Sequence, residues 1–341
     1  MPQVIMAAAE GEHALRSNTL DTVGNDDDKH RGSVLINNGD TMFYRMEDAQ
    51  VSDDMWFHVL IARNDTSTNS GTGLTFVNIY NDSDEFMAGW RDTNENFSTF
   101  LRFQPRYASA KTAGDDSAGA FNYEFPNLQF VDIDIRVRIS TVTNPNDTMT
   151  VDYYVSQQLR DTLVSTDAGG WERPQRVILG ALHTHATRDT CNYQDIIITD
   201  GVPTVGMELV TMAPAASGLY SAFTNNYTNI DELGYDSDDL IFATAAAQRE
   251  SWITVTPTFD TSDKIIYGFV ASQVVQTDLG AVVADFKPFV RINATNYDGD
   301  ALLASNLNPN CFIHVWTENP DTTAPWTQGD FDGLEVGLLT T

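Results

Sequence analysis

Residues 130–140, FVDIDIRVRIS, alternate strictly between apolar and charged side chains after the leading Phe130. Successive side chains of an extended chain point to opposite faces, so this period of two predicts a β-strand with one buried face. The buried face would carry the apolar residues Val131, Ile133, Ile135, Val137 and Ile139. The other face would carry the charged residues Asp132, Asp134, Arg136 and Arg138.

Similar short stretches recur along the chain, among them DMWFHVLIARND, LTFVNIYND, MTVDYYVSQQL, RVILGAL and QDIIITDG. They are rich in β-branched and aromatic residues and are separated by polar turns such as NDTSTNSGTG and TNPNDT. Regular short strands with polar turns are typical of an all-β sandwich or jelly roll. One helix is expected, over Asp238–Glu250, because this stretch has an acidic start followed by alanines.

A chain of 341 residues is long for one core and favours two domains. Small residues and prolines between Met212 and Gly218 indicate the junction, so we expect a larger domain over residues 1–210, a linker at 211–218 and a smaller β-sandwich over 219–341. Residues 1–32 are interpreted either as an N-terminal arm or as an ordinary strand and loop. In the second domain, KIIYGFVASQVVQ and VVADFKPFVRI are expected to pair, and Pro288 predicts an edge or a bulge.

The charge balance excludes one class of partner. With 48 acidic against 19 basic residues, the formal net charge of −29 repels nucleic-acid phosphates. Cys191 and Cys311 lie too far apart in the chain to suggest a disulfide framework or a cysteine-rich zinc site. No apolar segment is long enough to span a membrane and the start does not read as a secretory signal, so we expect a soluble protein made in a cytoplasm.

Asp132 and Asp134 are the first candidates for catalysis. The run Asp132-x-Asp134-x-Arg136 resembles the Glu-x-Asp-x-Glu strand of laminarinase-type jelly rolls, in which the outer two carboxylates cleave sugars. Arg136 cannot exchange a proton at neutral pH, so the resemblance breaks at the third position. The alternative is a solvent-facing strand whose Asp and Arg side chains pair across the sheet. We therefore expect no catalytic residue and no enzyme.

Three other groups of residues invite a binding role. His183 and His185 form a His-x-His pair that could hold a metal, although no further ligand falls at a completing spacing. The acidic loops at Asp26–Asp28 and Asp298–Asp300 are weak candidates for Ca²⁺, the alternative being polar turns that cap their own backbone. Trp171 lies in the most loop-like aromatic stretch, AGGWERP, and is a candidate for stacking on sugars.

Residues 1–210 resemble the concanavalin-like, laminin-G-like jelly rolls of bacteriophage virion proteins. The features that carry this resemblance are VIMAAAEGEHA, FVDIDIRVRIS, TVDYYVSQQLRDTLVST and NYQDIIITDGVPTVGMEL, the last containing a closing strand and the turn Thr204-Val205-Gly206. The rest of the chain resembles a domain that follows this jelly roll in phage tail proteins, through GLYSAFTNNYTNIDELGYDSDDLIFATAAAQRESW and HVWTENPDTTAPWTQGDFDGLEVGLL. In the latter stretch Thr327 is expected to cap a short turn with Asp330 near its start.

The resemblance implies a non-enzymatic structural protein of a bacteriophage virion, on the tail, baseplate or fibre, assembled in the host cytoplasm. Its partners would be copies of itself and other virion subunits, with no cofactor beyond a weak loop Ca²⁺. A glycan-binding module for receptor recognition and a capsid decoration protein are the alternatives. A glycoside hydrolase is the third hypothesis, which Arg136 weakens.

Overall fold

The computed structural model describes residues 3–8, 15–16, 21–23, 33–36, 42–46, 53–63, 75–92, 100–108, 116–118, 123–126, 129–140, 147–167, 171–180, 191–230, 240–256, 264–276, 285–303 and 310–341. By their contacts, the described residues up to Glu208 form one unit, and those from Leu209 onward form a second. No helix within these ranges is long and apolar enough to cross a membrane.

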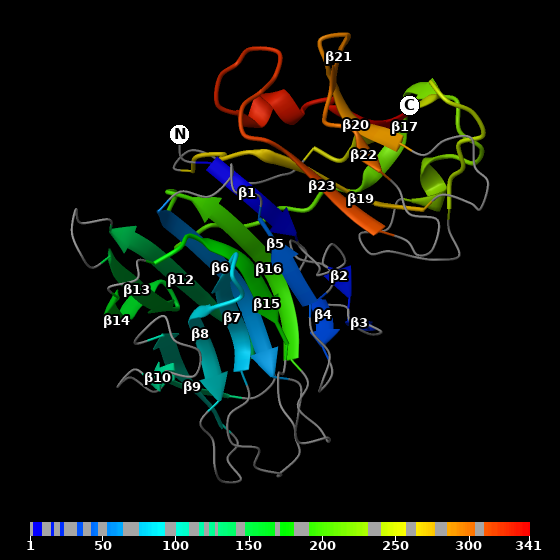
Figure 1. Ribbon diagram of the computed structural model, residues 1–341. Helices are drawn as coiled ribbons and strands as arrows, with labels where there is room; N and C mark the ends of the chain where they lie inside the picture. The colour runs from blue at the N-terminus through cyan, green and yellow to red at the C-terminus, as the bar shows by residue number, and fades with distance from the viewer. Residues whose placement is uncertain are drawn as a thin grey trace. The chain divides into compact units, whose positions relative to one another are not determined.

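The first unit is built from two antiparallel sheets (Figure 1). The first sheet has the strand order β14-β13-β12-β6-β16-β4-β3, with β1 also pairing with β16. Its strands are β1 (Gln3–Ala8), β3 (Asp21–Val23), β4 (Ser33–Ile36), β6 (Asp54–Arg63), β12 (Val131–Ser140), β13 (Asp147–Val155), β14 (Gln158–Asp167) and β16 (Cys191–Asp200).

The second sheet has the order β10-β9-β8-β7-β15-β5-β2, with β11 also pairing with β9. Its strands are β2 (Leu15–Arg16), β5 (Met42–Arg45), β7 (Thr75–Asn81), β8 (Phe86–Asp92), β9 (Phe100–Ala108), β10 (Asp116–Ala118), β11 (Tyr123–Pro126) and β15 (Pro174–Leu179).

The two sheets pack face to face through side chains from alternate positions. Trp90 of β8 meets Tyr153 of β13 edge-to-face, with ring centroids 5.1 Å apart. The Tyr193 hydroxyl of β16 donates to the carbonyl of Phe76 in β7 at 3.0 Å. The apolar face of β12, including Ile133 and Ile135, is fully buried between the sheets, as its alternation predicts. Its charged residues therefore lie on the outer face of the first sheet.

The second unit contains a third sheet of order β17-β18-β24-β20-β21, with β22 beside β20, and a separate pair β19-β23. Its elements are β17 (Pro214–Ser221), η3 (Tyr227–Asn229), β18 (Arg249–Thr254), β19 (Phe269–Val275), β20 (Asp285–Ile292), β21 (Thr295–Asp298), β22 (Leu302–Leu303), β23 (Asn310–Trp316), η4 (Gln328–Phe331) and β24 (Glu335–Thr340). Its core gathers aromatic residues, chiefly Phe269, Trp316, Trp326 and Phe331. The prediction of an all-β chain of sandwich-like units is confirmed.

The helix expected over Asp238–Glu250 is wrong for the described part of that stretch, which starts at residue 240. Phe242 instead forms a β-bridge with Thr224, and β18 begins at Arg249. The Gln248 side chain accepts from the backbone N–H groups of Thr244 and Ala245, at 2.7 and 2.8 Å. Tertiary pairing thus overrides the helix propensity of the alanines.

Strand pairing in the second unit also differs from the expectation. The stretch KIIYGFVASQVVQ contains β19, which pairs with β23 rather than with β20. β20 lies between β24 and the pair β21 and β22, so Pro288 is not on an edge strand. The pairing of β20 is nevertheless interrupted at Pro288 on one side. There β21 pairs with Phe289 and the residues after it, and β22 pairs with Phe286 and the residue before it. Residues 211–218, expected as a linker, supply most of β17.

The expected turn near the end of the chain is present. Thr327 precedes η4, and both its backbone N–H and its hydroxyl donate to the carboxylate of Asp330, at 2.6 and 2.8 Å. Gly333 then adopts a φ of +73°, a left-handed conformation that glycine tolerates, and the chain enters β24. The pair Thr327 and Asp330, three residues apart, therefore predicted this turn correctly.

Candidate functional site

The candidate site lies on the outer face of the first sheet, where β6 and β12 are neighbours. In their antiparallel register His58 stands directly opposite Asp134, and Asp132 stands opposite Leu60. Because side chains alternate along a strand, Asp132 and Asp134 point to the same side, and the register brings His58 to that side. The site thus joins residues that are 76 positions apart in the chain.

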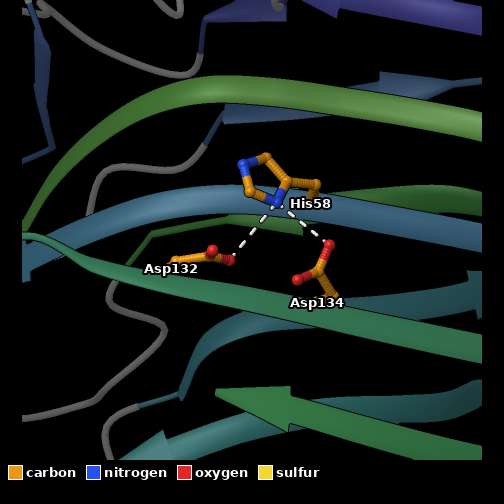
Figure 2. Close-up of side chains that lie close together, drawn as sticks. All are labelled: His58, Asp132 and Asp134. Atoms are coloured by element: carbon orange, nitrogen blue, oxygen red, sulfur yellow. Dashed lines mark hydrogen bonds and ion pairs between the residues drawn. The ribbon is translucent and has the colours of Figure 1, made fainter. Parts of the chain in front are cut away.

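The three side chains form a compact cluster (Figure 2). Nδ1 of His58 lies 3.0 Å from Oδ1 of Asp134 and 3.5 Å from Oδ1 of Asp132. At 3.0 Å the imidazole N–H donates to the Asp134 carboxylate, which places the ring proton on Nδ1. Figure 2 shows the other ring nitrogen, Nε2, turned away from both carboxylates.

The cluster is largely shielded from water. Asp134 is 0% and His58 2% exposed, whereas the Asp132 side chain keeps 19% of its surface accessible. The prediction that Asp134 is an ordinary solvated position is therefore wrong. The cover comes in part from the segment that follows β16, in which Val202 and Thr204 are themselves buried.

Two neighbouring residues hold the carboxylates in place. The Thr204 hydroxyl donates to Oδ1 of Asp134 at 2.6 Å, and the side chain of Gln157 hydrogen-bonds to Asp132. Thr204 sits in the turn that the sequence predicts as Thr204-Val205-Gly206. The N–H of Met207 closes this turn on the Thr204 carbonyl at 2.8 Å, and Gly206 adopts a φ of +78°.

A bulge in β16 lies beside the cluster. The register of β16 against β6 shifts between Gln194 and Ile197, the latter standing opposite His58. Within this bulge Asp195 is buried and adopts a φ of +50°, an unusual backbone conformation for a residue other than glycine. Bulges of this kind often occur next to functional sites, where they re-aim side chains.

Burial and charge perturb the ionisation of the cluster. Burial raises the pKa of Asp132 to about 6; the charge of His58 opposes this rise, whereas the charge of Asp134 and a hydrogen bond that protonated Asp132 makes to Asp134 add to it. Burial lowers the pKa of His58, but the hydrogen bond to Asp134 and the nearby carboxylates outweigh that effect and raise it above its ordinary value. The cluster therefore concentrates exchangeable protons and negative charge in a small volume.

Two carboxylate oxygens of the cluster lack hydrogen bonds within the described part of the chain. They are Oδ2 of Asp134 and Oδ1 of Asp132, both buried. A buried carboxylate oxygen without a partner is costly, and such atoms occur where a ligand, ion or water completes the site. Figure 2 shows the free oxygen of Asp134 turned toward Asp132.

The arginines of β12 are paired, as the sequence predicts for neighbours across a sheet. Arg136 donates to both oxygens of Asp54 in β6, at 2.7 and 2.6 Å. Arg138 donates to Asp152 of β13 at 2.8 Å. The hydrogen bond to Asp54 raises the pKa of Arg136 further, so this residue cannot take the place of a third catalytic carboxylate.

Aromatic rings accompany these pairs on the same face. Trp56 of β6 packs against Tyr154 of β13, with ring centroids 5.5 Å apart. The Arg136 guanidinium lies 4.9 Å from the Trp56 ring centroid. Tyr154 is half-buried and stands opposite Asp134 in the register. The outer face therefore combines flat rings with paired charges beside the cluster.

The other candidate residues have different fates. His183, His185 and Asp26–Asp28 lie outside the described residues. Both oxygens of Asp298 accept from Arg249, at 2.8 and 2.9 Å, so this carboxylate is committed to an ion pair rather than aimed at a calcium ion. Trp171 is only 5% exposed, which contradicts the prediction of a loop ring that stacks on sugars.

Sequence reasoning missed His58 because the six histidines are scattered along the chain. The available signal was its place in the alternating stretch DMWFHVLIAR, on the same face as Asp54 and Trp56. Pairing this stretch with FVDIDIRVRIS in register would have placed His58 near one of the two aspartates, but nothing local specifies that register.

No protein-family model and no curated protein sequence matches this chain. Solved structures with a similar fold include the receptor-binding domain of botulinum neurotoxin type G, at 11% identity and a TM-score of 0.37, covering 61% of this chain and 48% of that one. An alginate lyase from Aplysia kurodai has 7% identity and a TM-score of 0.38, covering 57% and 98%. A carbohydrate esterase from the Shiga toxin-encoding bacteriophage phi24B has 9% identity and a TM-score of 0.41, covering 59% and 100%.

These similarities concern the fold alone, and the chain spans about half the length of the botulinum domain that it matches. They do correct one expectation. The prediction of a protein that is not an enzyme is contradicted, since structures of similar fold include alginate lyases and a carbohydrate esterase. Arg136 breaks only the laminarinase-type arrangement, and the chain carries a different ionisable cluster at His58, Asp132 and Asp134.

Proposed function

We propose that the first unit binds a carbohydrate chain across the outer face of its first sheet. The observation that carries this proposal is the half-buried Tyr154 beside the pair Arg136–Asp54 and the partly exposed Asp132, with the buried Trp56 packed against Tyr154. Aromatic rings stack on the apolar faces of sugars, while paired charged groups offer fixed donors and acceptors to hydroxyls. Since strands rather than loops carry all four side chains, the surface is preorganised.

The charges favour a neutral glycan over a polyanionic one. Arg136 and Arg138 are each neutralised by an aspartate on the same face. The net charge of −29 also opposes the approach of a polyuronate or a sulfated chain. A neutral polysaccharide of a bacterial surface is the ligand class that this face accepts.

The setting that we propose is a bacteriophage particle. Its support is the resemblance of VIMAAAEGEHA, NYQDIIITDGVPTVGMEL and the C-terminal stretch to virion proteins of the tail, baseplate or fibre. The partners would then be copies of the chain, other virion subunits and a host glycan. Mass spectrometry of purified particles, with the chain present in a defined copy number, tests this setting separately from glycan binding.

A glycan array probed with the full chain tests the binding proposal. A hit is then measured by titration calorimetry with wild type, Tyr154→Ala and Tyr267→Ala, the last removing a 42% exposed tyrosine of the second unit. We expect Tyr154→Ala to weaken binding by up to about tenfold, the value of one stacking contact, and Tyr267→Ala to bind like wild type. Equal affinities for all three proteins would refute this face as the site.

A carbohydrate-active enzyme is the second candidate, favoured by the position of Asp132. Its side chain keeps 19% of its surface accessible at the margin of the proposed glycan face, and its Oδ1 lies 3.5 Å from Nδ1 of His58. Release of reducing sugar from the glycan identified above, and its loss in Asp132→Asn, is the expected result. A bound glycan that stays intact over prolonged incubation would leave binding as the function and exclude cleavage of that glycan.

A further inference from the structure

We propose that His58, Asp132 and Asp134 bind a divalent transition-metal ion, of the zinc, manganese or cobalt class, through Nδ1 of the histidine and the carboxylates of the two aspartates. This site does not depend on glycan binding, and it goes beyond the proposed function.

The spacing of the ligand atoms supports the proposal. Nδ1 of His58 lies 3.0 Å and 3.5 Å from the nearest oxygens of the two aspartates, and the three ligand atoms lie within 4.8 Å of one another. Ligands bonded at about 2.1 Å from a central ion lie about 3.0 Å apart in an octahedron and about 3.4 Å apart in a tetrahedron. The cluster therefore needs only small side-chain adjustments to surround an ion.

The charge of the cluster supports it independently. Two carboxylates face one imidazole, and their described contacts include no ion pair with lysine or arginine. The arginines nearest in the strand are occupied by Asp54 and Asp152. Buried negative charge of this kind is usually paired or bound to a metal. A cation between the carboxylates would supply the missing positive charge.

An unpartnered buried atom points into the same place. Asp134 is fully buried, and while Asp132 is ionised its Oδ2 accepts no hydrogen bond within the described part of the chain. In Figure 2 this oxygen is turned to the side on which Asp132 lies. An ion there would satisfy this oxygen together with Oδ1 of Asp132, the second buried oxygen without a hydrogen bond.

Outer residues already hold the ligands, as is usual around metal sites. Thr204 fixes Asp134 through its hydroxyl at 2.6 Å, and Gln157 holds Asp132. The partial exposure of the Asp132 side chain, 19%, gives an ion a route from solvent. Imidazole with two carboxylates suits zinc, manganese or cobalt, whereas calcium takes oxygen ligands.

Cobalt is the probe, because its visible absorption reports directly on the ligands. The full chain is stripped with EDTA, returned to buffer with about 0.15 M NaCl and excess Ca²⁺ to occupy weak acidic sites, and titrated with Co²⁺. We expect one equivalent to bind, with absorption bands of a nitrogen- and oxygen-ligated ion. Asp132→Asn should weaken binding at least about 100-fold, since losing even an outer partner typically costs 10- to 100-fold.

Two controls separate this site from others. The double variant His183→Gln, His185→Gln removes the other histidine pair of the sequence and should bind Co²⁺ like wild type. Asp84→Asn removes an exposed carboxylate of the first unit outside the cluster and should also bind normally. Loss of binding in the double variant, or equal binding by Asp132→Asn and wild type, would overturn the proposal.

A measurement on the wild-type chain keeps the test decisive if Asp132→Asn fails to fold. In a spectrum of ¹⁵N-labelled imidazoles, one equivalent of Zn²⁺ should shift the nitrogens of a single one of the six histidines. That signal should shift equally in the double variant, which leaves four histidines. Absence of any shift at millimolar Zn²⁺ would mean that a proton, rather than a metal, holds the cluster, and the proposal would be wrong.

Discussion

Among single residues, Asp134 carries a large desolvation cost, because its carboxylate is completely buried. Its Oδ1 accepts from both His58 and Thr204, at 3.0 and 2.6 Å. A buried charge needs several such donors to offset its lost hydration, and removal of one donor exposes much of that cost. Thr204 therefore anchors both the site and the segment that covers it.

Thr204→Val tests this role, because valine keeps the shape of threonine but cannot donate a hydrogen bond. We expect the free energy of unfolding of the first unit to fall by about 1–3 kcal/mol, the usual cost of depriving a buried group of its partner. Urea denaturation followed by tryptophan fluorescence measures it. Thr204→Ser should recover most of the loss, and a valine variant as stable as wild type would contradict the argument.

His314 gives a second prediction, since burial lowers its pKa and the charge of Asp300, whose Oδ2 lies 3.9 Å from Nδ1, opposes this change without cancelling it. Because the folded-state pKa lies below that of the unfolded chain, the unfolded chain binds the proton first as the pH falls. The folded state is therefore favoured by the neutral form of His314. This contribution to the free energy of unfolding is complete above a pH of about 6.5 and is lost as the pH falls below it.

His314→Gln should therefore lose less stability than wild type between pH 7.5 and pH 5.5, about two pH units that span the ordinary histidine pKa. Denaturation midpoints at the two pH values provide the comparison, and the other five histidines act as a common background in both proteins. An identical pH dependence in the variant would show that His314 does not contribute.

Among the strands of the second unit, β24 is paired on both sides, so little space remains for a side chain where a neighbour approaches closely. Gly337 of β24 lies between β18 and β20, standing opposite Ser251 and Phe289. A Cβ at this position would come within 2.1 Å of the Glu250 carbonyl oxygen and 2.6 Å of the Phe289 ring. Glycine is required here by the close approach of a neighbouring strand.

Gly337→Ala should accordingly destabilise the second unit by at least about 1–3 kcal/mol, as expected for overpacking. Gly329→Ala is the matched control, because the nearest atom to its added Cβ is 4.0 Å away. Thermal unfolding of the two variants beside wild type measures the difference. Equal melting temperatures for both would show that β24 can move to accommodate a methyl group.

Elements also show where sequence reasoning succeeds and where it stops. The Thr327–Asp330 turn follows from residues a few positions apart, and the alternating faces of β12 follow from a strict period. The helix expected near Ala245 and the pairing expected for β19 are wrong. The observed structure near Ala245 depends on a contact with β24, and that of β19 on pairing with β23. Both partner strands lie far along the chain.

At the scale of the whole molecule, net charge is the dominant electrostatic property. A formal charge of −29 makes the compact state repel itself, an effect that ions screen within about 8–10 Å at moderate ionic strength. The aspartate–arginine pairs described here relieve this repulsion only locally. Stability should therefore depend on salt in the direction opposite to that of a protein held together by surface ion pairs.

Raising NaCl from about 0.01 M to about 0.5 M should increase the melting temperature, because screening of like charges outweighs the weakening of surface pairs. Differential scanning calorimetry at constant pH measures this shift. A parallel series with an uncharged solute at the same osmolality separates screening from solute exclusion. A melting temperature that falls with salt would mean that the exposed ion pairs dominate.

Alternation and turn chemistry act between near neighbours, so the sequence alone predicts that the chain forms β-strands, which face of β12 enters the core, and the turn at Thr327–Asp330. The position of β6 beside β12, in the register that sets His58 against Asp134, and the hydrogen bond of Thr204 to the same carboxylate are known from the three-dimensional fold. The reason is physical. Many registers bury the same apolar face, and the choice among them depends on packing between segments about 70 residues apart.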